Sequence, residues 1–283
     1  HRRPPGEDLV DLRPRLGLPQ RRDEPDPCLV REDHLLAQRE RRLVELVAST
    51  LARDRRLHRG DHHLHHEVLA PRRRVALLGQ LIGDGSYLSH QPLRYTTSSE
   101  ENSRIVAEAA RDEFGCDVKR YAGRESWHQL LISGNGNRWH PDKLNGWLRQ
   151  LGIFGERSYQ KRVPEAVFRL SNRQIALLLR HLWATDGTIV PRANGRGSHG
   201  VSYSTNSPGL ASDVAALLLR LGIVARISSA KKGNYRPSFF VTVSGAPDQR
   251  CFLEAVGAFG PRAPQAERLQ ALLPWRSDGP PRS

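Results

Sequence analysis

Two Asp-Gly pairs, Asp84-Gly85 and Asp186-Gly187, are the residues of this sequence whose type and spacing best suit chemistry. They end two similar apolar segments, VALLGQLIGDG at Val75–Gly85 and IALLLRHLWATDG at Ile175–Gly187. The apolar spacing predicts a helix in each segment, closed by a glycine in the left-handed conformation. If these helices pack side by side, both carboxylates meet at negative helix ends, and the repulsion favours a divalent cation, Mg²⁺ or Mn²⁺. Cations held in this way can promote phosphodiester hydrolysis.

The first of these segments also carries a face of small residues. Gly79 and Gly83 lie four residues apart, so they share one side of a helix and let a second backbone approach closely. His181 and Thr185 stand at the equivalent places in the second segment. We therefore expect a helix pair whose packing is asymmetric or looser on the second side.

The two segments belong to a longer internal repeat. Four landmarks recur in the same order, namely the aspartates, a Tyr-hydroxyl cluster that begins at Tyr95 and Tyr203, a helix-closing glycine and a Ser-Gly pair. Their offsets are 102, 108, 107 and 111 residues. Such nearly constant offsets indicate a duplication into two α/β halves of about 100 residues each, packed about a pseudo-twofold axis.

The composition favours a protein that binds nucleic acid. The 283 residues include 44 Lys and Arg against 30 Asp and Glu, a formal net charge of +14, and cationic surfaces bind phosphates. No apolar run approaches the ~18 residues that span a bilayer. The three cysteines are odd in number and far apart, which argues against a disulfide framework and a cysteine zinc site. We expect no membrane contact and a reducing, cytoplasmic location near the nucleoid.

Residues 1–74 differ from the rest of the chain. They contain 17 arginines but no lysine, no Phe, Tyr or Trp, and seven of the twelve histidines. This composition predicts a low-complexity, mostly disordered segment with one amphipathic helix at Arg31–Asp54. A disrupted remnant of a splicing domain and a segment translated out of frame remain open alternatives. The histidine cluster at His62–His66 lacks a carboxylate or thiol at ligand spacing, so we expect a solvated segment there and no metal site.

From Leu77 onward the sequence resembles a known family. LLGQLIGDG at Leu77–Gly85 and LRHLWATDG at Leu179–Gly187 resemble the paired signature of LAGLIDADG (DOD-type) homing endonucleases, specifically the intein-encoded, two-motif kind. Lys161-Arg162-Val163-Pro164 resembles their lysine-containing block, and SPGLASDVAALLLRLGI at Ser207–Ile223 resembles a later block. The likeness covers Val75 to Phe259 and is strongest to actinobacterial inteins, with a replicative helicase as the suggested host.

The resemblance implies an α+β fold. Two pseudo-symmetric αββαββα halves, residues 75–168 and 169–262, would place their antiparallel sheets as a saddle over double-stranded DNA, with residues 263–283 as a tail. Such a two-motif chain acts as a monomer with internal pseudo-twofold symmetry. Four tryptophans are expected in the core, at Trp127, Trp139, Trp147 and Trp183.

The resemblance also implies site residues. Asp84 and Asp186, with the adjoining Gly85 and Gly187, would hold the metal, and Lys161 would support the first centre. By position Lys231 or Lys232 could serve the second centre, although a solvated turn accounts for them equally well. Ten residues in or beside expected strands and loops are candidate DNA contacts: Arg94, Tyr95, Arg120, Arg124, Arg192, Arg196, Tyr203, Arg226, Lys232 and Arg236.

Site-specific cleavage of both DNA strands is the function that these features favour. A catalytically idle DNA-binding module or an RNA maturase of the same fold is the first alternative, and the presence of both Asp84 and Asp186 speaks against the idle version. A protein-splicing element is the second alternative. The chain starts at His1 and ends with Pro281-Arg282-Ser283, so neither a splicing nucleophile nor a terminal His-Asn pair is visible, and we expect no self-splicing by this chain.

Overall fold

The computed structural model describes residues 71–123, 126–137, 139–192 and 199–273, all of which belong to one structural unit. The expectations for residues 1–70, for Arg124 and Arg196, and for residues 274–283 lie outside these described residues.

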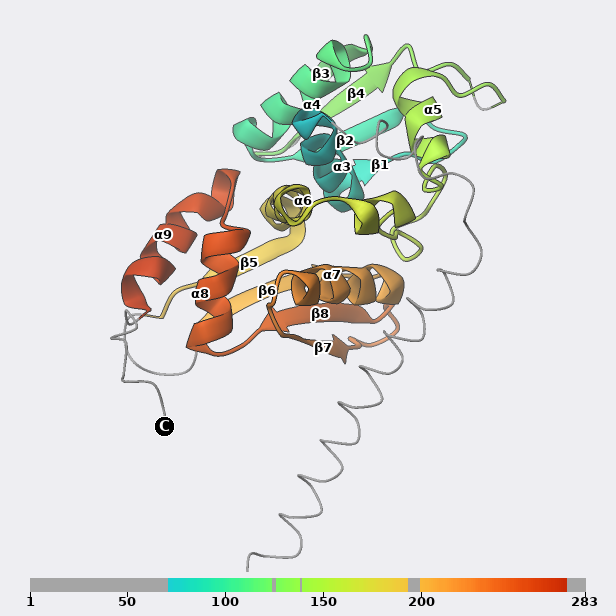
Figure 1. Ribbon diagram of the computed structural model, residues 1–283. Coiled ribbons are helices and arrows are strands. Elements are labelled where there is room, and N and C mark those ends of the chain that lie inside the picture. Colours follow the sequence, from blue (N-terminus) through green and yellow to red (C-terminus); the bar gives the residue numbers. More distant parts are fainter. Residues whose placement is uncertain (1–70, 124–125, 138, 193–198, 274–283) are drawn as a thin grey trace, which may run out of the picture. The chain divides into compact units, whose positions relative to one another are not determined.

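The described chain runs twice through the same order of elements (Figure 1). The first pass consists of α3 (Arg72–Asp84), β1 (Gly85–Ser86), β2 (Leu93–Thr97), α4 (Glu100–Asp112), β3 (Asp117–Ala122), β4 (His128–Ser133) and α5 (Lys143–Gln150). The second consists of α6 (Asn172–Asp186), β5 (Gly187–Val190), β6 (Gly200–Thr205), α7 (Pro208–Arg220), β7 (Ala225–Ala230), β8 (Ser238–Val243) and α8 (Ala246–Ala255). The expected αββαββα repeat is confirmed. A 3₁₀ turn, η1 (Glu165–Arg169), lies between the passes.

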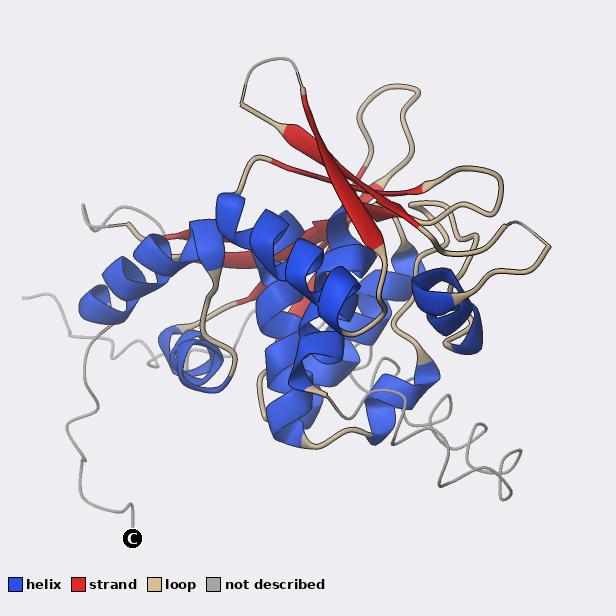
Figure 2. Ribbon diagram, turned by 90° about the horizontal axis from the view of Figure 1, so that it is seen from above, coloured by secondary structure: helices blue, strands red, loops and turns tan. Residues whose placement is uncertain are grey.

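Each half contains a four-stranded antiparallel sheet with matching topology. The strand orders are β1-β2-β4-β3 and β5-β6-β8-β7. Helix α4 packs on one face of the first sheet and α7 on one face of the second, and helices gather on one side of the strands in Figure 2. Side chains alternate accordingly, as in β4, where every second residue from His128 is buried. We call the opposite side of each sheet its free face.

Polar caps and glycines set the bounds of the helices. The Ser99 hydroxyl accepts a hydrogen bond from the Asn102 amide at the start of α4, and Ser207 does the same for Leu210 at the start of α7. Gly115 and Gly222 adopt the left-handed conformation after these helices, with φ of 59° and 78°. The same serine and glycine positions therefore bound equivalent helices in the two halves.

The glycines of the Asp-Gly pairs are not left-handed caps, contrary to the sequence-based expectation. Gly85 and Gly187 have φ of −79° and −78° and extended ψ angles, and each begins a strand. Space explains the residue type instead, because a Cβ atom at Gly85 would lie only 2.5 Å from the Leu81 carbonyl oxygen, and one at Gly187 would overlap Trp183. The chain therefore turns from helix into strand within one residue of each aspartate.

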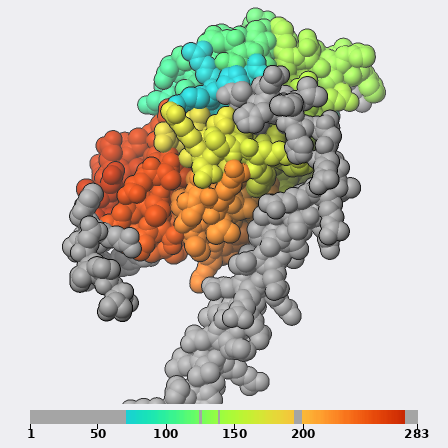
Figure 3. Space-filling model, viewed as in Figure 1, coloured from blue at the N-terminus to red at the C-terminus, as the bar shows by residue number. Residues whose placement is uncertain are grey.

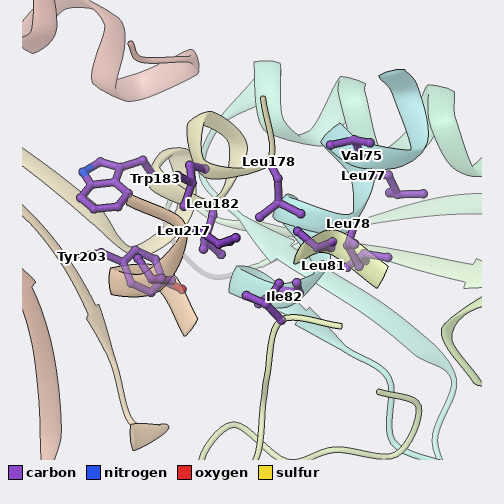
Figure 4. Close-up of a cluster of buried hydrophobic side chains, with 14 of the residues drawn as sticks. Val75, Leu77, Leu78, Leu81, Ile82, Leu178, Leu182, Trp183, Tyr203 and Leu217 are labelled. Atoms are coloured by element: carbon purple, nitrogen blue, oxygen red, sulfur yellow. The ribbon is translucent and has the colours of Figure 1, made fainter. Parts of the chain in front are cut away.

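Helices α3 and α6 pack against each other along the seam between the two halves. Leucines of both helices interlock there, and Trp183 and Tyr203 extend the cluster into the second half (Figure 4). A Cβ atom at Gly79 would lie 2.7 Å from the Leu178 carbonyl oxygen, and one at Gly83 would overlap the Thr185 side chain. The pairing is asymmetric, as expected, but it is not looser, because the larger residues of α6 fill the space that the glycines of α3 leave.

The seam also lies centrally in the space-filling view. There the residues of α6 and the linker before it, in yellow, separate the first half from the orange and red second half (Figure 3). Their side chains are therefore in a position to join the two halves.

The second half continues beyond residue 262. A 3₁₀ turn, η2 (Gly260–Arg262), leads into α9 (Ala263–Leu272), where Leu269 is completely buried. Residues 263–272, which we expected in a tail, therefore contribute to the core. The tryptophan prediction is half right, because Trp147 and Trp183 are buried whereas Trp127 and Trp139 are exposed. Within the described part of the chain, each helix is too short or too polar to cross a bilayer.

Candidate active site at the ends of the central helices

Asp84 and Asp186 are the last residues of α3 and α6, and they lie within electrostatic reach of each other. Burial, the nearby Asp186 carboxylate and the weaker opposing effect of two cations set the pKa of Asp84 at about 7. Burial likewise raises the pKa of Asp186, and the nearby Lys161 and Arg262 oppose the shift. Two carboxylates crowded at negative helix ends form a site that is short of positive charge.

Lys161 is the basic group at the end of α3. Its ammonium donates hydrogen bonds to the carbonyl oxygens of Ile82, Gly83 and Gly85, at 2.8, 2.7 and 2.9 Å. Burial lowers the pKa of Lys161 to about 8, while Asp186 and Asp84 oppose the shift. The structure thus brings Lys161 to the first centre, which we define as Asp84 with Lys161.

Arg262 occupies the equivalent place at the end of α6. Its Nε donates to the Gly187 carbonyl oxygen at 2.6 Å, and its Nη2 donates to the Thr185 carbonyl oxygen at 3.2 Å. These two acceptors are the counterparts of Gly85 and Gly83, and Arg262 follows Lys161 by 101 residues. We define Asp186 with Arg262 as the second centre.

Arg262 was not predicted from the sequence, because the basic residue of the second centre was expected to be a lysine. A weaker signal was available, since LGIFG at 151–155 precedes Lys161 and VGAFG at 256–260 precedes Arg262. Both glycines of each segment adopt positive φ angles, so the two linkers bend alike. Lys231 and Lys232 lie exposed in the turn after β7, and the basic contact that the structure describes at the end of α6 comes from Arg262.

The capping serine of α7 holds the linker that carries Lys161. The Ser207 hydroxyl donates a hydrogen bond to the Lys161 carbonyl oxygen at 2.7 Å. The buried carboxylate of Asp213 on α7 accepts the Arg162 guanidinium at 2.7 and 2.8 Å and the Val163 amide at 3.0 Å. The residue after Lys161 is therefore fixed from α7, which makes α7 part of the support of the first centre.

Part of the chain matches a known protein family. Residues 173–257, which span α6 to α8, match the family model described as a LAGLIDADG-like domain. The chain contains a LAGLIDADG-like domain.

The chain is also similar to segments of replicative DNA helicases. The chain is 43% identical over 193 residues to the DnaB helicase of Rhodothermus marinus, a match that covers 66% of the chain and 20% of the helicase. It is 38% identical over 188 residues to DnaB of Synechocystis sp., covering 65% and 22% respectively. The chain thus spans about a fifth of the length of the helicases it matches.

Two solved structures are similar at low sequence identity. The homing endonuclease I-DmoI in complex with DNA and Mn aligns over 66% of this chain and 97% of its own, with 13% identity and a TM-score of 0.44. Full-length DUF199/WhiA from Thermatoga maritima aligns over 76% and 66%, with 12% identity and a TM-score of 0.46.

A polar cavity of about 260 Å³ opens beside Asp186. Its wall combines the end of α3, the linker that carries Lys161, and the adjoining ends of β6 and β8. The lining side chains include Ser158, Lys161, Tyr203, Asn206 and Ser238. Most of these groups can donate a hydrogen bond, so the cavity suits a ligand rich in acceptor oxygens.

The expected DNA contacts divide between the two faces of the sheets. Arg94 and Arg226 stand on the free faces, in register with Leu131 and Thr242. Arg120 points to the helix side, where it pairs with Glu100 of α4 at 2.5 and 2.7 Å, so it is not on the expected surface.

The remaining expected contacts lie elsewhere. Tyr95 and Tyr203 are completely buried, so neither lies on the open face of a strand, where the sequence placed them. Arg192 is exposed after β5, and Arg236 stacks on the Tyr159 ring with 3.9 Å between the guanidinium carbon and the ring centroid.

Three free-face residues were missed by the sequence analysis. Lys119, Tyr121 and Gln129 stand on the same side of the first sheet as Arg94, as the antiparallel register shows. The Gln129 amide donates a hydrogen bond to the Thr96 hydroxyl at 3.0 Å. Strand alternation could have found these residues once the buried positions of β2 and β4 were known.

The metal-ligating capacity of the site rests on its two carboxylates. The carbonyl oxygens of Gly85 and Gly187, expected as additional ligands, already accept hydrogen bonds from Lys161 and Arg262. Among the described residues no group of three or more His, Cys, Asp or Glu side chains could hold an ion. A hard cation between Asp84 and Asp186 would relieve their repulsion, so the donor chemistry fits Mg²⁺ or Mn²⁺ with the other ligands drawn from water and substrate.

Proposed function

We propose that this chain is a site-specific DNA endonuclease that uses divalent metal to hydrolyse one phosphodiester bond in each strand of a duplex. The observation that carries the proposal is the pair of centres at the seam. Each consists of an aspartate at a helix end and a basic side chain bonded to the carbonyl oxygens beside it. Two equivalent centres about one pseudo-twofold axis match the two antiparallel strands of DNA.

Asp84 and Asp186 would hold Mg²⁺ or Mn²⁺, which supplies an activated water and stabilises the leaving oxygen when bound. The raised pKa of Asp84 indicates that its carboxylate gains from an added cation. Lys161 and Arg262 fix the backbone that carries the aspartates and bring positive charge to a site that binds an anionic strand.

The free faces of both sheets would lie against the duplex. Phosphate contacts position the DNA and side chains on the strands contact base edges. Arg94, Lys119 and Gln129 give the first face two cations and an amide, whereas the second face combines the single cation of Arg226 with Ser202, Phe240 and Thr242. We infer a non-palindromic target, because the two faces present different chemistry.

The relatives suggest the setting in which the enzyme acts. The segments that match this chain make up about a fifth of each DnaB helicase. We propose that the chain is, or derives from, an intein endonuclease inserted in such a gene, acting as a monomer on DNA in the cytoplasm, and that its target is the gene without the insertion.

DNA binding without cleavage is the second candidate function. The small number of acidic ligands at the site favours it, since two carboxylates are all that the described residues offer there. Incubation with Mg²⁺ separates the two candidates.

The test uses supercoiled plasmids that carry the DnaB coding sequences of Rhodothermus marinus and Synechocystis sp. from which the stretch matching this chain has been deleted. An endonuclease linearises at least one plasmid at a single position, and EDTA prevents the cut. A chain that binds these plasmids tightly but leaves them supercoiled over a range of Mg²⁺ and Mn²⁺ concentrations is a binding module, and the nuclease proposal is then wrong.

Arg262 provides a second test of the two-centre arrangement. Arg262→Ala should slow cleavage of one strand by about 10²-fold, so that nicked plasmid accumulates, because loss of one positioned cation removes about 3 kcal/mol of stabilisation. Arg262→Lys should recover most of the rate. Lys231→Ala, in the exposed turn, is the matched control. An Arg262→Ala protein that cuts both strands as fast as the Lys231→Ala protein would contradict the assignment.

A further inference from the structure

Tyr95 and Tyr203 occupy equivalent places in the two halves but have different surroundings. Each lies on the second strand of its sheet, opposite the glycine that follows the catalytic aspartate in sequence. The Tyr95 hydroxyl donates a hydrogen bond to Gln80 Oε1 at 2.5 Å. The residue equivalent to Gln80 in α6 is Leu182, which cannot accept one.

The Tyr203 hydroxyl is consequently a buried donor without a hydrogen-bond partner among the described residues. Its side chain has 0% exposure, and its ring packs on Trp183 with centroids 5.5 Å apart. In Figure 4 the hydroxyl end of the ring points away from Trp183 and toward the end of α3 near Ile82. Burial of a phenol in this way costs desolvation free energy unless another group accepts a hydrogen bond from its hydroxyl.

Tyr203 lines the cavity beside Asp186. Lys161 and Ser158 line the same cavity from the linker. Asn206 does so from the end of β6, with its Oδ1 already accepting from the Ser238 hydroxyl at 3.2 Å, so that its amide group remains to donate. Donors from two segments, the linker and the end of β6, therefore converge on one space next to a catalytic carboxylate. The Lys161 ammonium adds positive charge there, because its three N–H groups already donate to backbone carbonyl oxygens.

We propose that Tyr203 is a substrate-binding residue of the second centre, whose hydroxyl donates a hydrogen bond to a phosphate oxygen of the DNA strand held in this cavity. The proposal rests on the proposed nuclease function and adds a residue to it. Phosphate suits the donor-rich wall, since its oxygens are acceptors only. Burial raises the pKa of Tyr203 well above its usual value, so the hydroxyl keeps its proton wherever the protein is folded at neutral pH.

The counterpart of Tyr203 in the first half, Tyr95, is not free to bind a strand. There Gln80, Asn102 and Tyr95 form a closed network, in which the Gln80 amide donates to Asn102 Oδ1 at 3.3 Å and the Asn102 amide donates to the Ala184 carbonyl oxygen at 3.1 Å. The Tyr95 hydroxyl is therefore committed to structure. The two centres should differ in how strongly they hold their strand.

The experiment compares Tyr203→Phe with Tyr95→Phe, two changes that remove one oxygen from equivalent tyrosines. Because the Tyr203 hydroxyl has no protein partner, Tyr203→Phe should leave Tm unchanged or slightly higher. It should slow cleavage of one strand about tenfold and leave the cleavage rate of the other strand within about twofold of wild type. The substrate is a short duplex that contains the site cut in the plasmid, with each strand labelled separately. Tyr95→Phe should lower Tm by about 2–4 °C and leave the ratio of the two strand rates unchanged.

Equal cleavage of both strands and equal DNA affinity in Tyr203→Phe and wild type would overturn the proposal for Tyr203 while the nuclease function stands. A drop in Tm for Tyr203→Phe as large as that for Tyr95→Phe would also overturn it, because the hydroxyl would then serve the fold. Failure of wild type to cut any of the plasmids would instead refute the nuclease function, and the role of Tyr203 with it.

Discussion

Single residues explain why the seam tolerates buried polar groups. His181 of α6 lies against the Phe259 ring, with centroids 4.6 Å apart, and its Nδ1 accepts a hydrogen bond from the Gln80 amide at 3.2 Å. Burial lowers the pKa of His181 to about 4. The neutral imidazole is therefore part of the folded seam.

The titration of His181 predicts a dependence of stability on pH. The unfolded chain binds the proton near pH 6.5 and the folded chain only near pH 4, so the free energy of unfolding should fall as the pH drops from 6.5 toward 4, by at most about 3 kcal/mol. His181→Gln should flatten this part of the profile, and His140→Gln, at an exposed site, should not. Urea unfolding at several pH values measures both, and identical slopes in the two variants would refute the role of His181.

At the same scale, the sequence predicted the acids but only one of the basic partners. Recognisable motifs contain Asp84, Asp186 and Lys161, and the structure brings these three residues to one site. Arg262 and Tyr203 depend on backbone geometry and on which neighbour is missing. The shared bend of the two linkers and the presence of Leu182 at the position equivalent to Gln80 can be recognised only when the helices and strands of the two halves are aligned.

Among the elements, the seam between α3 and α6 depends on two glycines. Gly79→Ala should lower the free energy of unfolding by about 1–3 kcal/mol, since the new methyl group would lie 2.7 Å from the Leu178 carbonyl oxygen and must force the helices apart. Gly200→Ala is the control, because its Cβ would meet only Val190 at an ordinary 3.6 Å. Equal stability of the two variants in thermal or urea unfolding would show that the helices are not packed this closely.

The strand faces predict which arginines contact DNA. Arg94→Ala should weaken DNA binding and lower the slope of log affinity against log salt by about 1, as expected for one lost phosphate contact. Arg120→Ala should leave the slope unchanged, because that guanidinium lies on the helix side with Glu100. Fluorescence titrations at several salt concentrations measure both slopes. A lower slope for Arg120→Ala than for Arg94→Ala would show that DNA does not bind the free face. Sequence proximity to a strand could not separate these arginines, because face depends on register.

At the scale of the whole molecule, duplication accounts for the architecture and its divergence accounts for the asymmetry. The repeat into two α/β halves was predictable from four landmarks that recur at nearly constant offsets, whereas the αββαββα order was predicted from the family resemblance. The packing of α9 was not predicted, because the resemblance ended the second half at residue 262 and left residues 263–283 as a tail. The two centres share a plan but differ in their basic residue, in the cavity beside them and in the sheet that adjoins them.

The central claim is that Asp84 and Asp186 at the shared seam carry double-strand cleavage. The most direct measurement is the Mg²⁺-dependent rate of plasmid linearisation by Asp84→Asn and Asp186→Asn, with Asp112→Asn at the exposed end of α4 as the control. The account predicts that both seam variants bind the target within about threefold of wild type but form no linear product, while the control cuts normally. Linearisation at the wild-type rate by either seam variant would contradict it.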